Sequence, residues 1–541
     1  MRPGKLDLLI KNGRIVDGTG NPFYRADVGI SRGRIACIAR GIKKGEAKRV
    51  IDAADLIVSP GFFDAHSHDD AYLFVNPQCD EKVLQGVTTD VIGSCGLSMA
   101  PVVEGHGVEF QGILGALGAE NLAKEFWRIK TFNEFLQKLA KAKPGINVVP
   151  LVGHGTIRIA AMGMEKRPPT DAELKKMKRL MAEAMKSGAY GLSTALILAP
   201  ASYAQTDEVI ELAKIAGRYK GVFTIHLRSE SDHIMEALEE ALRIGREADV
   251  PVEISHHKAA GKENWGKSIE TLAMLAKGRT AGVEVTCDQY PYPAGSLFLA
   301  AALPPSIQEG GPEVYAEKLK DPVIRGQVMD EIEKSQMGQW ESLIRNCGFE
   351  GIVIASSNHG NYVGKSLAEI AKMVGKNPYD IFFDLVIEEK TSTKVILWMM
   401  DEEDVKRIMK SPLTMIGTDG IPGFGKNKFH PRMTGTFPRV LGHYVRKEGL
   451  IPLEEAIRKM TSLPAQTFGV KNKGLLKEGF DADLVVFDPE TIIDKATFEN
   501  PAQKPEGIEW VLVNGEVAVE KGKVAGAKSG RVLRHNFQIP Q

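Results

Sequence analysis

Nine short apolar runs alternate with amphipathic helical patterns between about residues 56 and 468. The clearest unit reads GVFTIHL, then SDHIMEALEEALRIGREADV, then PVEISHH, which is typical of a strand, a helix and a second strand. Repetition of this unit predicts parallel strands covered by helices, the arrangement of a (β/α)8 barrel of the TIM type. Such a barrel needs eight strands, so one run is surplus, and GIVIAS at residues 351–356 is the run we leave out.

GIVIAS ends a long excursion from the repeating pattern, at about residues 294–361. Within this segment the stretch EVYAEKLKDPVIRGQVMDEIEK favours helices. Loops of this length in compact folds are usually functional or independently structured. We therefore expect a subdomain inserted into the barrel.

The two ends of the chain resemble each other in pattern. LLIKNGRIVDG near the start and EWVLVNGEVAVEKGK near the end both place Asn-Gly, a hairpin turn signal, between apolar alternations. Isolated hairpins are only marginally stable, so the two ends are expected to share one structure. We predict a small β-sandwich from residues 1–60 and 469–541, and a catalytic barrel from residues 61–468.

Composition excludes several classes of partner. Lys and Arg together number 69, as do Asp and Glu, so the chain has no excess of positive charge that would favour binding to nucleic acid or to an anionic membrane. The sequence has no signal-peptide pattern and no apolar stretch near the roughly 18 residues of a membrane span. Five scattered cysteines suggest a reducing compartment rather than a disulfide framework. We expect a cytoplasmic protein that acts on a small molecule; its oligomeric state stays open.

Six residues of metal-ligand type stand at the ends of the predicted strands: His66, His68, Cys95, His226, His256 and Asp419. The carboxyl ends of parallel barrel strands form the face that carries the active site. The alternative interpretation is that the histidines are unrelated surface residues and that the cysteine is a buried core thiol. Residues of that kind would not be expected to gather at the same end of the strands. Imidazole, thiolate and carboxylate together suit zinc better than magnesium or calcium.

Six ligands exceed the four of a tetrahedral zinc site. They suggest two subsites, one of which is weaker; a single catalytic zinc with spectator groups is the alternative. His256 continues its strand directly, so we prefer it to His257 as a ligand. His154 also follows an apolar run, and we leave it out of the ligand set.

These motifs, read with GSCG, HLRSE, SHHK, DQYPY, TDG and HPRMTGTFPRVLG, resemble the D-aminoacylase branch of the metal-dependent amidohydrolases. The similarity covers nearly the whole chain. The resemblance implies a tight zinc held by Cys95, His226 and His256. It implies a weaker subsite of His66, His68 and Asp419, with Cys95 facing both.

The resemblance also implies four substrate-binding residues: Lys258, Tyr290, Ser296 and Arg432. Arg432 has the best independent support, because its planar fork suits a substrate carboxylate. One loop departs from the family pattern, with Ala195 and Ala201 at positions where glycine is common, and Ile197 and Leu198 in a region that is often aromatic or polar. This loop can shape the acyl or side-chain pocket, so substrate preference should not be copied from a relative.

The expected activity is zinc-dependent hydrolysis of N-acyl-D-amino acids, with Asp419 as the general base and then the general acid. The closest alternatives are a D-amino-acid dipeptidase and a cyclic-amide hydrolase of the dihydroorotase or hydantoinase type. The latter typically use a carboxylated lysine as bridging ligand, and no strand-end lysine suits that role. A catalytically inactive binding scaffold is a further alternative, although every matched ligand is present.

Overall fold

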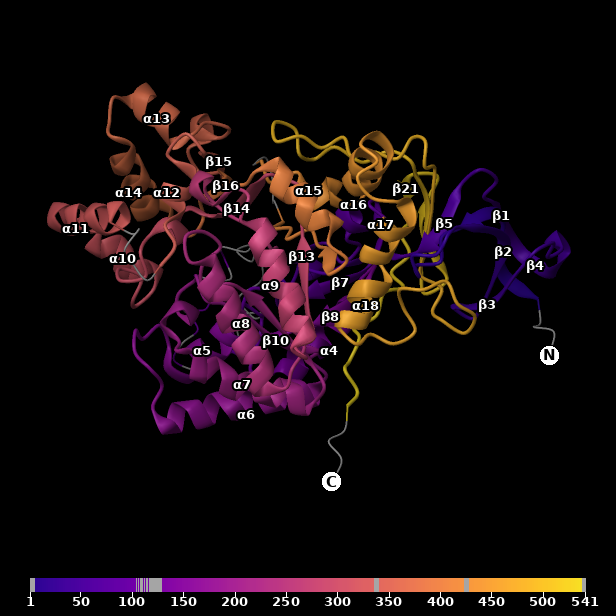
Figure 1. Ribbon diagram of the computed structural model, residues 1–541, viewed down its shortest axis with the longest axis horizontal. Coiled ribbons are helices and arrows are strands. Elements are labelled where there is room, and N and C mark those ends of the chain that lie inside the picture. The colour runs from indigo at the N-terminus through magenta and orange to yellow at the C-terminus, as the bar shows by residue number, and fades with distance from the viewer. Residues whose placement is uncertain are drawn as a thin grey trace.

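A barrel of parallel strands surrounded by helices lies at the centre of the molecule (Figure 1). This computed structural model describes residues 5–103, 129–334, 340–422 and 428–537, together with residues 105, 107, 110, 112 and 115. Two parallel sheets supply the barrel, in the orders β6-β7-β8 and β9-β10-β11-β12-β13-β17. Their bounds are β6 Phe62–Asp64, β7 Val87–Ile92, β8 Asn147–Pro150, β9 Val152–Gly153, β10 Gly191–Ala195, β11 Val222–His226, β12 Val252–Ile254, β13 Val285–Gln289 and β17 Thr414–Ile416.

Two junctions join these sheets into a closed ring of eight strand positions. Only Leu151 separates β8 from β9, so together they occupy one position, and the Leu151 amide donates to the Ile92 carbonyl at 2.9 Å. On the other side the Asp419 amide donates to the His66 carbonyl at 2.8 Å, which links the segments following β17 and β6. The eight runs retained from the sequence thus provide the eight barrel positions.

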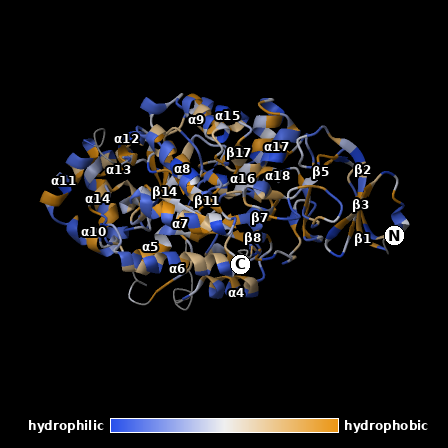
Figure 2. Cartoon of the chain, turned by 60° about the horizontal axis from the view of Figure 1, so that its bottom comes forward, coloured by the Kyte–Doolittle hydropathy of each residue, from blue (hydrophilic) through white to orange (hydrophobic). Residues whose placement is uncertain are grey.

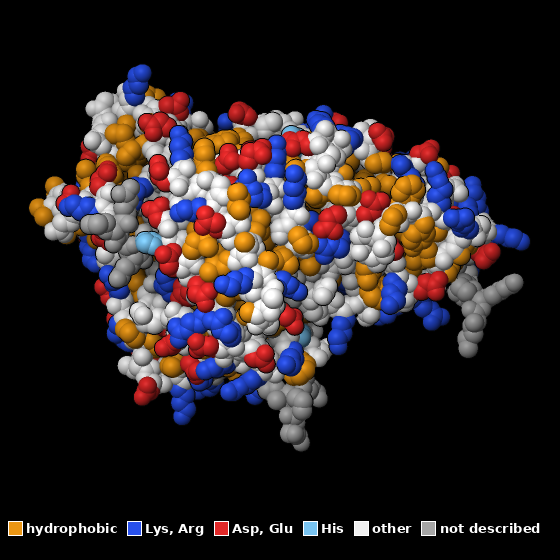
Figure 3. All heavy atoms as spheres, viewed as in Figure 1, with side chains coloured by type: hydrophobic (Ala, Val, Ile, Leu, Met, Phe, Trp, Pro, Cys, Tyr) orange, Lys and Arg blue, Asp and Glu red, His pale blue; other side chains and the backbone are white. Residues whose placement is uncertain are grey.

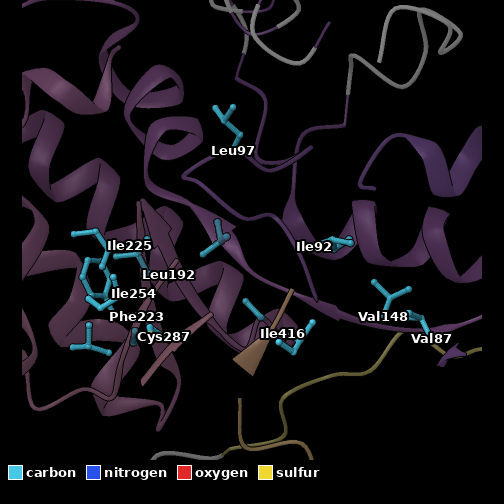
Figure 4. Close-up of a cluster of buried hydrophobic side chains, with 14 of the residues drawn as sticks. Val87, Ile92, Leu97, Val148, Leu192, Phe223, Ile225, Ile254, Cys287 and Ile416 are labelled. Atoms are coloured by element: carbon cyan, nitrogen blue, oxygen red, sulfur yellow. The ribbon is translucent and has the colours of Figure 1, made fainter. Parts of the chain in front are cut away.

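Alternation along each strand separates an outer apolar layer from the barrel interior. On β11, Phe223 and Ile225 belong to the apolar cluster shared with the surrounding helices, as Figure 4 shows for these two and for Leu192 and Ile254. His226, at odd spacing from them, therefore points to the interior.

Helices cover the outside of the barrel and also connect its strands (Figure 2). They are α1 Tyr72–Val75, α2 Asp80–Val83, α4 Phe132–Ala142, α5 His154–Met162, α6 Asp171–Ser187, α7 Thr206–Arg218, α8 Ile234–Ala248, α9 Ser268–Thr280, α15 Glu402–Lys410, α16 Arg432–Arg439, α17 Leu453–Lys459 and α18 Ser462–Thr467. A π-helix, residues Val440–Lys447, continues α16. Among the described residues, no helix has both the length and the apolar character needed to span a membrane.

An insertion lies between β13 and β17. Its antiparallel sheet has the order β14-β16-β15, and its helices belong to a separate apolar cluster. The bounds are β14 Ala294–Phe298, β15 Ile352–Ser356, β16 Lys394–Trp398, α10 Pro312–Lys318, α11 Pro322–Glu333, α12 Leu343–Cys347, α13 Leu367–Val374 and α14 Pro378–Glu389. GIVIAS forms β15, so its exclusion from the barrel is confirmed. The sequence pattern placed the end of the insertion at about residue 361, whereas β16, which pairs with both β14 and β15, ends at Trp398.

Both ends of the chain contribute to a nine-stranded sheet at the opposite end of the molecule from the insertion (Figure 1). Its order is β21-β20-β19-β18-β5-β1-β2-β3, with β4 paired to β1. The bounds are β1 Leu6–Ile15, β2 Tyr24–Ser31, β3 Arg34–Ala39, β4 Ala47–Asp52, β5 Ile57–Pro60, β18 Leu484–Phe487, β19 Ile508–Val513, β20 Glu516–Glu520 and β21 Lys523–Val524.

A network of buried polar side chains joins this sheet to the barrel. The Asp483 carboxylate, just before β18, accepts from Asn147 of the barrel strand β8 at 3.1 Å and pairs with Lys473 at 2.5 Å. Asn147 in turn accepts from the Asn514 amide group at 2.8 Å. Buried polar groups that are fully paired fix one relative position of the elements they join.

On the outer surface, acidic and basic side chains are interspersed over the face drawn in Figure 3, in keeping with their equal numbers.

Candidate metal centre

The six predicted ligand residues meet at the carboxyl end of the barrel, and all six are buried. Their donor atoms fall into overlapping groups that could hold a metal ion. One group is His66, Cys95 and His256; a second is His66, His68 and Asp419; a third is His226 and His256 with Glu230. Of the ten predicted site residues, all but His66 and Arg432 line one pocket.

The Cys95 sulfur is the centre of this arrangement. It lies 3.4 Å from His256 Nε2, 3.8 Å from His226 Nδ1 and 3.4 Å from His66 Nε2. Zinc bonds of about 2.3 Å to sulfur and about 2.0–2.1 Å to nitrogen, at tetrahedral angles, separate the two donors by about 3.5 Å. The observed separations bracket this value, so the sulfur and its imidazole neighbours have the spacing of zinc ligands.

A carboxylate completes the second group. Asp419 Oδ1 lies 3.1 Å from His68 Nε2 and 3.5 Å from His66 Nε2. His66 therefore stands between the sulfur of Cys95 and the carboxylate of Asp419. The two candidate groups are therefore adjacent and share His66.

Three of the six residues have left-handed backbones, with φ of 50° at Cys95, 37° at His256 and 46° at Asp419. Non-glycine residues rarely adopt this conformation, and such residues cluster at functional sites. At His256 the consequence is visible, because strict alternation after the outward-facing Ile254 would send this ring outward. The left-handed turn brings it into the barrel instead.

Electrostatics favours the ligating forms of Cys95 and Asp419. Burial alone would raise the pKa of the Cys95 thiol, but the imidazoles of His66 and His256 outweigh it and hold that pKa well below its usual range. Burial would likewise raise the pKa of the Asp419 carboxyl, yet the Arg432 guanidinium lowers it well below the ordinary value. A thiolate and a carboxylate are the forms that bind a metal.

The four predicted substrate-binding residues gather on one side of the pocket. Arg432 Nη1 lies 2.7 Å from Asp419 Oδ2, Nη2 donates to the Ser296 carbonyl at 3.2 Å, and the guanidinium lies 4.5 Å from the centre of the Tyr290 ring. Lys258 Nζ is 2.6 Å from Glu230 Oε1 and 5.8 Å from the Tyr290 ring centre. Lys258, Tyr290 and Arg432 are buried, and Ser296 is half-buried.

The two histidines that we set aside have other partners. His257 turns outward to the Thr271 hydroxyl of α9 at 2.9 Å. Both ring nitrogens of His154 form hydrogen bonds, Nδ1 with the Thr194 hydroxyl at 2.9 Å and Nε2 with the Glu208 carboxylate at 3.0 Å.

Sequence reasoning missed two carboxylates that orient the histidines. Glu230 Oε1 lies 2.9 Å from His256 Nδ1, and Asp288 Oδ2 lies 3.1 Å from His66 Nδ1. In both cases the ring nitrogen opposite the candidate metal position is held, which fixes the tautomer and the orientation of a ligating histidine. Both carboxylates could have been noticed, since Glu230 follows His226 by four residues and Asp288 lies on β13.

A buried lysine beneath the site was also missed. Lys82 Nζ lies 2.5 Å from Asp64, 3.0 Å from Asp69 and 3.6 Å from Asp90, and all four side chains are fully buried. Burial raises the pKa of Asp90 and the neighbouring carboxylates add to the shift. We call these four residues the Lys82 cluster.

The Lys82 cluster connects the strands that carry the candidate ligands. Asp64 accepts from the His66 amide at 3.2 Å and from the Thr418 amide at 2.8 Å. Thr418 also receives a hydrogen bond from Lys82 at 3.0 Å. The backbone on either side of the second candidate subsite is thus tied to one buried ammonium group.

Comparison with known proteins identifies the family. Residues 49–519 match the family described as "Amidohydrolase family". The chain belongs to the amidohydrolase family. The resemblance inferred from the motifs is therefore confirmed.

Two curated amidohydrolases of Alcaligenes xylosoxydans xylosoxydans are similar over almost their whole length. A D-aminoacylase is 39% identical, with 97% of each chain covered. An N-acyl-D-aspartate deacylase is 36% identical, covering 99% of this chain and 97% of that one. Among solved structures, the N-acyl-D-glutamate deacylase of Bordetella bronchiseptica, complexed with zinc and a phosphonate inhibitor, has a TM-score of 0.83. It is 36% identical, covering 98% of this chain and 100% of that one.

Replacing Lys82 by Met tests the role of the Lys82 cluster in this amidohydrolase. The substitution leaves three buried carboxylates without their cation, so the free energy of unfolding should fall by about 3–5 kcal/mol. Urea denaturation followed by circular dichroism measures the change. The matched control is Lys175→Met on the exposed face of α6, which should stay within about 0.5 kcal/mol of the original protein. Equal small effects of both substitutions would contradict a structural role for the cluster.

Proposed function

We propose that this chain uses zinc to hydrolyse the amide bond of N-acyl-D-amino acids, releasing a carboxylate and a free D-amino acid. The observation that carries the proposal is the spacing of Cys95 Sγ, 3.4 Å from His256 Nε2 and 3.8 Å from His226 Nδ1. The similarity to a D-aminoacylase over 97% of the chain supports the reaction class. It also supports the choice of the D-enantiomer.

The donor set fits zinc. A thiolate with imidazole nitrogens is preferred by zinc, whereas magnesium and calcium prefer shells of oxygen ligands. In this proposal Cys95, His226 and His256 hold the tight ion. His66, His68 and Asp419 form the weaker subsite, with Cys95 able to face both. The carboxylates that hold His66 and His256 from behind support these roles.

When bound, zinc supplies Lewis acidity, which acidifies water and polarises a carbonyl group. The Asp419 carboxylate accepts the proton of the attacking water and returns it to the departing amine. Its pKa, held below the ordinary range by Arg432 despite burial, keeps it ionised before attack. Tyr290 and the apolar residues that line the pocket exclude bulk water from this proton transfer.

The substrate carboxylate is assigned to the Arg432 side of the pocket. Nε and Nη1 of this buried guanidinium lack a well-aligned hydrogen bond within the described part of the chain. Because Nη1 is paired with Asp419, Nε is the donor that has no partner among the described residues, and a planar guanidinium suits a carboxylate. Tyr290 positions the fork by stacking beneath it, and Ser296 and Lys258 complete this side.

We also propose the division of the chain into domains that the sequence predicts. Residues 61–468 make the catalytic barrel, interrupted by the insertion that begins at about residue 294. Residues 1–60 and 469–541 make a separate unit, which we propose folds as a small β-sandwich. Apolar side chains from both terminal segments, such as Leu8, Ile30 and Leu484, belong to one cluster, which supports this arrangement. Five unpaired cysteines support a cytoplasmic location.

A panel of substrates tests the function. The zinc-loaded protein should hydrolyse N-acetyl-D-amino acids with a kcat/KM at least 100-fold above that for the L-enantiomers, followed by release of the free amino acid. Hydantoin, dihydroorotate and D-amino-acid dipeptides serve as the competing substrates. Faster turnover of a cyclic amide or a dipeptide would replace the proposal with that activity. No turnover of any compound would favour a binding scaffold.

Replacing Asp419 by Asn tests the assigned base. Because the amide cannot accept the proton of the attacking water, kcat should fall by about 100-fold or more. Metal analysis should still find the zinc of the tight subsite, to which Asp419 does not belong. The exposed Asp171→Asn substitution at the start of α6 provides the control and should leave kcat unchanged. Activity of Asp419→Asn close to that of the original protein would exclude this base.

A further inference from the structure

A second, larger cavity lies beside the metal pocket, between the barrel and the insertion. It is open to solvent on one side and has a volume of about 700 Å³. Its walls come from the segments after α5 and β10 on the barrel side, and from the loop after β14 and from α11 on the insertion side. Figures 1 and 2 both show the insertion helices α10 and α11 on the same side of the molecule as α5. We call it the outer cavity.

Ile197 separates the outer cavity from the metal pocket and lines both. The neighbouring residues divide between them, because Leu196 lines the outer cavity and Leu198 the metal pocket. Ile197 is half-buried, whereas its two neighbours are buried. The two spaces are therefore adjacent, with one apolar side chain at their boundary.

The wall from the insertion is attached to the barrel close to this boundary. Glu341 lines the outer cavity, and its Oε2 accepts from the Glu230 amide at 2.5 Å. Its Oε1 accepts from the Asn346 side chain at 2.7 Å. Since Glu230 also lines the metal pocket and holds His256, this contact fixes the outer cavity relative to the proposed reaction centre.

The order of the barrel strands indicates which part of a substrate would enter the outer cavity. Ile197 closely follows β10, and Arg432 is paired with Asp419, which closely follows β17. In the closed ring of eight positions, β10 and β17 are four positions apart in either direction, so they are opposite each other. An extended N-acyl amino acid has its carboxylate and its acyl tail at opposite ends. With the carboxylate at Arg432, the acyl tail points towards Ile197.

The chemistry of the outer cavity suits an apolar tail. Its lining includes Leu196, Tyr203, Ala301, Leu303 and Trp340. Four cationic side chains also line it, and three of them have acidic partners: Lys334 with Asp330 at 2.7 Å, Arg167 with Glu173 at 2.8 Å and Arg228 with Glu240 at 2.8 Å. The fourth is Lys166. The volume is far larger than an acetyl group requires and lies in the range of sites that hold drug-sized ligands.

We propose that the outer cavity binds the distal part of a long aliphatic acyl group, so that the substrates are N-acyl-D-amino acids with medium or long acyl chains. This inference rests on the proposed function and narrows its substrate class. Each buried methylene contributes about 0.8 kcal/mol, which corresponds to about a fourfold gain in binding. Chain length beyond the acetyl group should therefore raise kcat/KM.

A chain-length series provides the experiment. The zinc-loaded full-length protein is assayed with N-acetyl, N-butanoyl and N-octanoyl derivatives of the same D-amino acid, namely the one best accepted as its N-acetyl derivative. We expect kcat/KM for the octanoyl compound to exceed that for the acetyl compound at least 10-fold. A flat or falling series, with the acetyl compound still hydrolysed, would overturn the acyl assignment and leave the proposed function intact. Failure to hydrolyse any member of the series would instead overturn the proposed function and this inference with it.

Filling the outer cavity gives the second arm. Ala301→Trp places a ring in the cavity, and Ser306→Trp does the same from an exposed position that lines it, where folding is less at risk. Both should lower kcat/KM for the octanoyl compound at least 10-fold and leave the acetyl compound within twofold. Val323→Trp adds the same ring on α11 at a side chain that is 66% exposed and should change neither. Octanoyl turnover that is equal in all three variants would place the acyl chain elsewhere.

Discussion

The thiolate of Cys95 is the feature on which the rest of the site depends. Its sulfur lies within 3.8 Å of nitrogens from three histidines, each at or just after the end of a different strand. No segment of the chain could bring these groups together alone, and the barrel does so because all its strands end on one face. The left-handed backbones of Cys95 and His256 show that the local conformation is adapted to this convergence.

Charges buried behind the ligands keep this arrangement in place. Asp288 and Glu230 hold His66 and His256 from the side away from the sulfur. Beneath them, Lys82 neutralises a group of carboxylates whose backbone partners include the amide of His66. A buried charge is costly unless it is paired, and removing one partner of such a group leaves the others uncompensated.

The sequence predicted those features that depend on local pattern, namely the eight barrel runs, the separate GIVIAS strand and the strand-end positions of the ligands. It did not reveal Lys82, because lysine is rarely fully buried and a short helix carries no pattern that would mark it. It placed the end of the insertion near residue 361, because the pairing of β16 with β14 joins residues about 100 positions apart. The role of Ile197 depends on two neighbouring cavities, which only the folded chain defines.

The central claim is that one sulfur ligand belongs to the tight zinc site. Zinc K-edge X-ray absorption on the purified, zinc-loaded protein measures this directly, since sulfur and nitrogen scatterers differ in distance. The account predicts one sulfur at about 2.3 Å together with nitrogen or oxygen ligands at about 2.0–2.1 Å. A shell of nitrogen and oxygen alone would remove Cys95 from the site and contradict the account.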